Sequence, residues 1–383
     1  WFSSAIADLS RVVATAERET VLTRGINVIR VGINGLKVKE WSFEEPSLYV
    51  AHAILELENG SVADEFFEQF GFREVGIEDG KITLNGRPTF LKGVSRHEEY
   101  PPYGRAIPSR LVYEDLAAIK EIGANFVRTA HYPNNPLTYV YADRIGLLVW
   151  EEIPIYWFDC AAFPLQAARG IAKQMLLEMV FRDFNRPSII IWSLANECAC
   201  RQERTSFLRS LRDLVKLVDP TRLVTQAIAW DPSDDTSLKA GLDLLAVNMY
   251  FGVFYGKLDD MGGAINELRG RYPQLPLVIS EFGYWSGGGV GEAGQAEYFV
   301  KAWRIIASNA DKLAGVAWWT MFDYHGYGTH FNTFGAVDWY RRDRKLLYRS
   351  IYDAYHGSLK SEASGEGLLP LPLALAALAV AVL

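Results

Sequence analysis

Eight stretches of the chain share one hydrophobic pattern: each is short and mostly apolar, and most of them end in polar or aromatic residues. Such a run is typical of a strand that is buried on both faces, as in a parallel sheet. The predicted strands are residues 89–97, 125–132, 147–154, 188–197, 223–230, 244–250, 276–283 and 313–323. The fourth shows the pattern best, because the apolar run in "SIIIWSLANE" leads directly to Asn196 and Glu197.

Most gaps between these strands carry a helical pattern. In residues 109–123 apolar side chains recur at i, i+3 and i+4, and Ser109 stands where an N-cap is expected. Residues 204–219 repeat this spacing. Eight strands that alternate with helices over roughly 270 residues are the count of a (β/α)8 barrel. An open, doubly wound sheet would also alternate, but no glycine-rich turn follows the first strand.

The region before the barrel is rich in predicted strands. Three strand-like runs cover residues 26–33, 48–60 and 61–72. Asn85-Gly86, between two further strand-like runs, predicts a tight hairpin. The fold class is therefore an α/β (β/α)8 barrel preceded by a partial β-sandwich, of which we expect the first half to be absent.

The end of the chain is apolar, and residues 368–383 carry no charge. At about 1.5 Å per residue, a helix of this length falls slightly short of a hydrocarbon core of roughly 30 Å. A clipped membrane span, a removable anchor signal and a terminal extension stay open. We therefore expect either a cytoplasmic protein or one tethered to a membrane through this tail. The predicted domains are residues 1–78 (partial sandwich), 79–358 (barrel) and 359–383 (linker and tail).

Composition excludes several classes of function. The chain is 49% hydrophobic and 22% charged, so it can bury a large core. Its net charge is −7 and no basic run is present, which argues against nucleic-acid binding. Three cysteines, Cys160, Cys198 and Cys200, are too few and odd in number to indicate a disulfide framework. They also lack the second Cys or His pair of a structural zinc site.

Candidate chemistry gathers at the predicted strand ends, where barrels of this kind place their active sites. The polar and aromatic residues there are His97, Arg128, His131, Glu151, Glu152, Asn196, Glu197, Tyr250, Glu281, Trp318 and Trp319. Two carboxylates that flank one cleft are what glycoside hydrolysis needs, because one donates a proton while the other attacks or activates water. For any single glutamate at a strand end, a rim salt bridge is the better explanation. The catalytic interpretation is favoured by the convergence of Glu197, Glu281, Arg128, His131 and Asn196.

With these residues in view, the chain resembles glycoside hydrolase family 2, which contains β-galactosidases and β-glucuronidases. The matching stretches span residues 82 to about 340 and are "NGRPTFLKGVSRHEEYPPYGRA", "GANFVRTAHYPNNP", "GLLVWEEIP", "PSIIIWSLANE" and "PLVISEFG". "EEPSLY" and "GFRE" in residues 40–75 resemble the end of the family's immunoglobulin-like domain. We expect the family's N-terminal jelly-roll domain to be absent from this chain.

The resemblance implies a retaining double displacement with a glycosyl-enzyme intermediate. Glu197 would be the general acid/base and Glu281 the nucleophile. Asn196 would bind the sugar 2-hydroxyl and Tyr250 would support the nucleophile. The remaining residues implied to line the substrate pocket are His97, Arg128, His131 and Trp319. The two carboxyl groups should then lie about 5–5.5 Å apart.

Departures from the family pattern bear on the sugar. Ser95 stands where relatives usually carry Asn, and Phe334 stands where the family's glucuronidases carry the Lys that contacts the glucuronate carboxylate, although Asn332 is present. A carboxylate without its cation would bind poorly. We therefore expect a terminal β-galactoside, with glucoside, fucoside, mannoside and a β-glucuronidase activity as alternatives. No cofactor is expected, although some family galactosidases use Mg²⁺, for which Glu152 is the one matching acidic candidate.

Two other classes of function stay open. Without the N-terminal domain, the barrel could be an inactive sugar-binding remnant. A membrane-tethered surface protein would depend on residues 368–383 more than on the pocket. The expected partner is a carbohydrate substrate; a homo-oligomer is also open.

Overall fold

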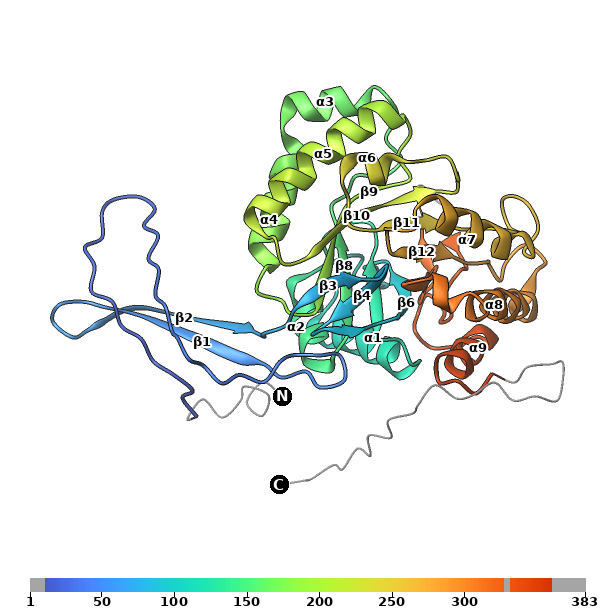
Figure 1. Cartoon of the computed structure of the whole chain (residues 1–383). Coiled ribbons are helices and arrows are strands. Elements are labelled where there is room, and N and C mark those ends of the chain that lie inside the picture. Colours follow the sequence, from blue (N-terminus) through green and yellow to red (C-terminus); the bar gives the residue numbers. More distant parts are fainter. Residues whose placement is uncertain (1–10, 327–330, 360–383) are drawn as a thin grey trace.

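A closed barrel of eight parallel strands forms the centre of the protein (Figure 1). The structure is a computed structural model and describes residues 11–326 and 331–359. In order around the barrel the strands are β6 (Leu91–Arg96), β7 (Phe126–Thr129), β8 (Leu148–Glu152), β9 (Ile189–Asn196), β10 (Leu223–Ala229), β11 (Leu245–Asn248), β12 (Leu277–Phe282) and β13 (Gly315–Trp318). Each lies within one of the eight predicted stretches, so the barrel prediction is confirmed.

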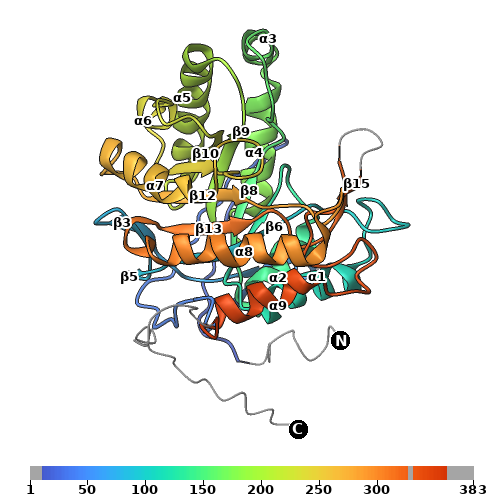
Figure 2. The same ribbon diagram turned by 90° about the vertical axis from the view of Figure 1, so that its right-hand side faces the viewer.

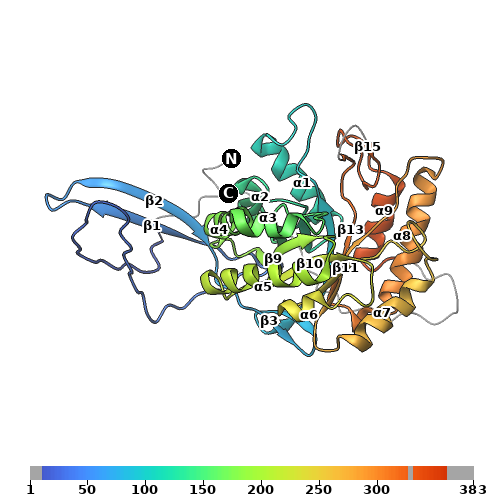
Figure 3. The ribbon, with the colours of Figure 1, turned by 90° about the horizontal axis from the view of Figure 1, so that it is seen from above.

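Helices surround this barrel (Figure 3). They are α1 (Ser109–Glu121), α2 (Pro136–Ile145), α3 (Ala162–Arg169), α4 (Ile171–Asp183), α5 (Arg201–Val218), α6 (Thr236–Ala240), α7 (Asp260–Arg271), α8 (Gly291–Ala307), α9 (Leu346–Tyr355) and the 3-10 turn η1 (Ala310–Lys312). Figure 2 shows α8 and α9 lying side by side against the strands. The apolar faces of the helices bury one hydrophobic layer against the outside of the barrel, as amphipathic helices require.

A second apolar cluster fills the barrel's interior toward the end at which the strands begin. It joins side chains that point inward from several strands with others from the segments that precede the barrel; they include Trp41, Ile82, Leu91, Phe126, Leu148, Trp150, Ile190 and Val278. Alternation along each strand places one residue in this interior and the next in the outer layer. Side chains at the opposite ends of the strands are therefore free to be polar.

Antiparallel sheets precede the barrel. β1 (Tyr49–Glu56) and β2 (Val62–Phe70) form a ribbon that extends away from it, and β3 (Val75–Glu78), β4 (Lys81–Leu84) and β5 (Arg87–Pro88) form a small sheet (Figure 1). Asn85 and Gly86 both have positive φ and make the predicted tight turn between β4 and β5. A last pair, β14 (Tyr324–His325) and β15 (Phe331–Asn332), lies beyond β13.

Two local predictions are wrong. Residues 26–33 form no strand: their apolar side chains are exposed and no neighbouring strand offers its backbone hydrogen bonds, without which an extended segment is not a strand. Ser109 does not cap α1; it is the first helical residue, and Pro108 before it has no side chain that can accept a hydrogen bond.

The cysteine interpretation is corrected as well. Cys160 and Cys200 form a disulfide, with Cα atoms 5.3 Å apart, whereas Cys198 is free and buried. The two partners are 40 residues apart in sequence. They meet because each follows one of two neighbouring strands, β8 and β9, which run parallel and so deliver their succeeding loops to the same end. Counting cysteines could not reveal this proximity.

No helix within the described part of the chain is long and apolar enough to cross a membrane. The apolar tail at residues 368–383 lies outside the described residues, so the expectation of a membrane tether stays a prediction.

Trp41 fixes the segment before β1 to the barrel and offers a test of this packing. Its side chain is fully buried, and its indole N–H donates to the backbone carbonyl of Asp143 in α2 at 2.8 Å. We expect Trp41→Ala to lower the free energy of unfolding by about 4 kcal/mol, because it leaves a large cavity and an unpaired carbonyl. Urea denaturation followed by circular dichroism measures this. Leu217→Ala, at an exposed position of α5, is the control; equal losses in both variants would contradict the prediction.

Candidate active site

One buried guanidinium lies at the centre of the strand ends. Arg128, on β7, is fully buried and its Nη1 donates to Glu281 Oε1 at 2.6 Å. Its Nη2 donates to Asn196 Oδ1 at 2.9 Å and to both carboxylate oxygens of Glu152 at 3.1 Å. The partners come from β12, β9 and β8. A single cation therefore holds the ends of four strands in one arrangement.

Glu281, at the end of β12, is held through both carboxylate oxygens. Besides the contact of Oε1 with Arg128, its Oε2 accepts a hydrogen bond from the Tyr250 hydroxyl at 2.7 Å. Burial raises the pKa of Glu281, and the nearby charge of Glu197 adds to this, whereas Arg128, His131 and the hydroxyl of Tyr250 oppose it. The opposing groups are the ones that stabilise a carboxylate that must stay ionised while it is out of water.

Glu197 follows β9 and is only half buried. Its Oε1 accepts from Asn248 Nδ2 at 2.8 Å and its Oε2 from Trp157 Nε1 at 3.0 Å. Its backbone has φ +47°, in the left-handed region that non-glycine residues seldom adopt. The chain thus turns sharply where it leaves the buried strand, which brings this carboxylate to the rim. The two glutamates therefore have different environments: one is enclosed by a cation and a phenol, the other is open on one side.

Asn248, the last residue of β11, connects the two glutamate-bearing strands. Its Nδ2 contacts Glu197 and also Asn196 Oδ1, at 3.2 Å, while its Oδ1 accepts from Ser280 Oγ at 2.7 Å. Sequence reasoning missed Asn248. The available signal was its place at the end of the sixth predicted strand, two residues before Tyr250.

Aromatic and imidazole rings form one wall of the site. His131 stacks on Trp319 with ring centroids 5.0 Å apart, and His97 stacks on Tyr324 at 4.4 Å and meets Trp319 edge-on at 5.2 Å. The indole of Trp319 donates to the Tyr324 hydroxyl at 2.9 Å. Burial lowers the pKa of His97 well below its usual range, so this ring is neutral at physiological pH. A neutral ring can both donate and accept hydrogen bonds, which suits contact with sugar hydroxyls.

All eight residues predicted for the site lie in this one network, whereas two other strand-end residues do not. Glu151 points out of the barrel to Arg182 of α4, with a 3.1 Å ion pair. Trp318 packs between Phe282 and Phe299 in the outer layer. Strand alternation separates them from Glu152 and Trp319, their immediate neighbours. Trp157, in the loop after β8, and Tyr324, in β14, are further residues of the site to which the strand-end rule gave no role.

Glu152 was the candidate for holding Mg²⁺. Its two oxygens already accept hydrogen bonds from Arg128, and further ones from His131 Nδ1 at 2.7 Å and Trp150 Nε1 at 3.1 Å. In residues 11–326 and 331–359, no group of three or more His, Cys, Asp or Glu side chains is arranged to hold a metal ion. Glu152 is thus fully engaged as the counter-ion of Arg128.

A parallel barrel with two glutamates at one rim, each in a different environment, defines a barrel of the glycoside hydrolase class. Similarity to known protein families identifies the family within this class. Residues 75–304 match the family model described as "Glycosyl hydrolases family 2, TIM barrel domain", and residues 5–73 match "Glycosyl hydrolases family 2". The chain belongs to glycoside hydrolase family 2.

Relatives and solved structures agree with this membership. A β-galactosidase of Thermoanaerobacterium thermosulfurigenes is 29% identical over 88% of this chain, and a protein of Formosa agariphila is 30% identical over 78%. A β-galacturonidase structure from Eisenbergiella tayi has a TM-score of 0.77 and 29% identity, and covers 84% of this chain and 61% of that one. The chain spans 45% of the first relative's length and 38% of the second's.

The ion pair of Arg128 and Glu152 predicts a specific pH dependence of stability. Burial alone would raise the pKa of Glu152, but Arg128 and His131 lower it to about 2. A folded-state pKa below the unfolded one stabilises the protein above pH ~4.5, and this contribution is lost as the pH falls toward 2. We expect Glu152→Gln to lower the free energy of unfolding by about 3 kcal/mol at pH 7, and the difference from the original chain to shrink below pH ~4.5.

Urea unfolding at pH 7, 5, 4 and 3 tests this. Glu203→Gln, at an exposed position in the first turn of α5, is the matched control. If the difference in unfolding free energy between Glu152→Gln and the original chain stays constant across this pH range, an ionised Glu152 paired with Arg128 is not what stabilises the fold.

Proposed function

We propose that the chain is an exo-acting retaining β-glycosidase that hydrolyses terminal β-D-glycosides by double displacement. The observation that carries this proposal is the pairing of Glu197 and Glu281 at one rim in unequal environments. Glu281 is enclosed between Arg128 and Tyr250, while Glu197 is half buried and accepts only N–H donors. Two carboxylates with separate roles are the requirement of this reaction.

In the first step, a carboxylate oxygen of Glu281 attacks the anomeric carbon and the bond to the leaving oxygen breaks. Glu197 donates its proton to that oxygen, so the aglycone leaves as a neutral alcohol. In the second step, Glu197 takes a proton from water, whose oxygen attacks the anomeric carbon and releases Glu281 as a carboxylate. This route predicts carboxyl groups about 5–5.5 Å apart.

The surrounding residues support these roles. Arg128 and Tyr250 oppose the rise in the pKa of Glu281 that burial causes, and so favour the ionised form that a nucleophile needs. The amide of Asn196, whose Oδ1 is held by Arg128 and Asn248, has an NH2 group that can donate to a sugar 2-hydroxyl. The stacked rings of His131 and Trp319, with His97 beside them, lie close to Glu281 and can pack against the sugar ring.

A neutral sugar is the substrate we favour, with β-galactoside first. Phe334 is buried beside Tyr250 and Trp285, with ring centroids 6.4 Å and 5.7 Å away. These rings offer no charge to a sugar carboxylate, so a uronide would lose its solvation without a counter-ion. Besides the β-galactosidase and the β-galacturonidase named above, the similar solved structures include a β-glucuronidase, 28% identical to this chain, which keeps uronides in the test.

A sugar-binding remnant is the second candidate. The complete network around both glutamates favours the enzyme.

The decisive experiment is hydrolysis of a panel of fluorogenic β-glycosides: galactoside, glucoside, mannoside, fucoside and glucuronide. We expect one neutral sugar to be preferred, and Glu281→Gln to lower kcat for it by at least about 10³-fold, because the nucleophile is lost. Glu203→Gln is the control. Binding of a sugar by a folded chain that hydrolyses no member of the panel would support the remnant instead.

The choice of sugar has its own test at Phe334. We expect Phe334→Lys to lower activity on the preferred neutral glycoside and to raise kcat/KM for the glucuronide relative to it by about tenfold or more, because the new ammonium can pair with the sugar carboxylate. Phe334→Leu is the matched control, since it removes the ring without adding a charge. Glucuronide turnover by the unaltered chain that exceeds its galactoside turnover would overturn the preference for a neutral sugar.

A further inference from the structure

The loop after β8 runs alongside the loop after β9, past the point where both strands end. The Asn196 N–H donates to the carbonyl of Ile155 at 2.8 Å, and the Trp157 N–H donates to the carbonyl of Asn196 at 3.0 Å. The Ala199 N–H then donates to the carbonyl of Phe158 at 2.8 Å. The Cys160–Cys200 disulfide closes this paired segment at its far end. The two loops are therefore joined by backbone hydrogen bonds and by one disulfide bond.

These two loops carry the two partners of a single contact. Trp157 comes from the first loop and Glu197 from the second, and the indole Nε1 donates to the carboxylate Oε2 at 3.0 Å. Trp157 is 62% exposed. An exposed indole has little packing to fix its rotamer, so the position of its N–H depends on the backbone that carries it.

That backbone is unusual. Within the described residues six non-glycine residues have positive φ, and three of them are Trp157 (+55°), Glu197 (+47°) and Cys200 (+57°). Residues in this region cost free energy and persist only where their surroundings hold them. The paired loops and the disulfide are such surroundings. Arg204 of α5 adds to them, because its guanidinium binds the carbonyl of Cys198 and the carboxylate of Asp234.

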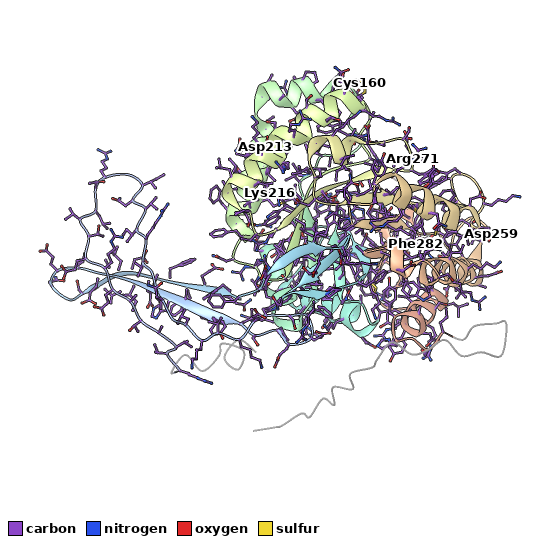
Figure 4. All side chains as sticks on the ribbon, in the orientation of Figure 1. Cys160, Asp213, Lys216, Asp259, Arg271 and Phe282 are labelled. Carbon is purple, nitrogen blue, oxygen red and sulfur yellow. A yellow bond between two sulfur atoms is a disulfide. The ribbon has the colours of Figure 1, made fainter. Side chains whose placement is uncertain are left out.

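We propose that Trp157 is a positioning residue for the acid/base Glu197, and that the Cys160–Cys200 disulfide holds it in place. The inference rests on the proposed function. The indole N–H fixes Oε2, Asn248 fixes Oε1, and the carboxyl group is thereby oriented toward the leaving oxygen of a bound glycoside. The disulfide lies in the region of α3 and α5 where Figure 4 marks Cys160, and it acts through the loops and not by touching the substrate.

The test uses the dependence of rate on the leaving group. The dinitrophenolate of a dinitrophenyl glycoside departs without being protonated. The more basic phenolate of a phenyl glycoside of the same sugar needs a proton from Glu197 as it departs. We expect Trp157→Phe to lower kcat/KM about tenfold for the phenyl glycoside and less than about twofold for the dinitrophenyl glycoside. Phe181→Leu, another exposed aromatic side chain, on α4, is the control for surface substitution. An equal loss on both substrates would make Trp157 an aglycone contact and overturn the positioning role.

The contribution of the disulfide is measured by a double-mutant cycle. Cys160→Ser with Cys200→Ser should lower the phenyl-glycoside rate in the same selective way, by about threefold to tenfold. Adding Trp157→Phe to this variant should then cost less than about threefold, because the contact is already loosened. A full tenfold further loss would show that the disulfide and Trp157 act independently. Should the double variant not fold, reduction of the native chain with a phosphine, monitored by thiol titration, replaces it with the same expected ratios.

Failure of this inference is distinguishable from failure of the proposed function. Glu197→Gln should lose the phenyl-glycoside activity far more than the dinitrophenyl activity whatever Trp157 does. If it does and Trp157→Phe shows no selective loss, the positioning role alone is wrong. If the native chain hydrolyses neither substrate, the proposed function itself is wrong, and the positioning role falls with it.

Discussion

The site depends on one buried cation. Arg128 is fully enclosed and binds groups that come from three other strands, among them Glu152 and Glu281. Removing a guanidinium from water is costly unless it is paired, so the folded chain has to place these carboxylates beside Arg128. Conversely, two carboxylates this near to each other would repel without the cation. The relative positions of Arg128, Glu152 and Glu281 are therefore set by one electrostatic constraint.

Sequence pattern predicted the parts of this molecule that follow from local periodicity. The eight strands could be recognised because a strand buried on both faces is a continuous apolar run. The candidate site residues could then be chosen because active sites of such barrels lie at the carboxyl ends of the strands. Glu197 and Glu281 were found in this way. This rule could not distinguish Glu152 from Glu151. Successive side chains of β8 point to opposite faces, and only the structure shows which of the two glutamates points into the barrel.

The features that prediction missed are set by contacts between distant segments. Asn248 acts through its two amide atoms on residues of other strands, which no local pattern reveals. The disulfide joins cysteines whose loops meet only because β8 and β9 are neighbours. The segment at residues 26–33 has the composition of a strand, but strand formation also requires a partner, and composition carries no information on that.

The closure of the barrel has a consequence for how activity is acquired. The last pairing joins β13 to β6, so that Gly315 lies beside Leu91, more than two hundred residues earlier in the chain. Trp319 and His97, which meet across this seam, become neighbours only when that pairing forms. Contacts of such sequence separation form slowly, because the loop entropy must be lost before they stabilise anything. During refolding, helical content should therefore return before the pocket does, and a partly folded chain would contain most of its secondary structure and no binding site.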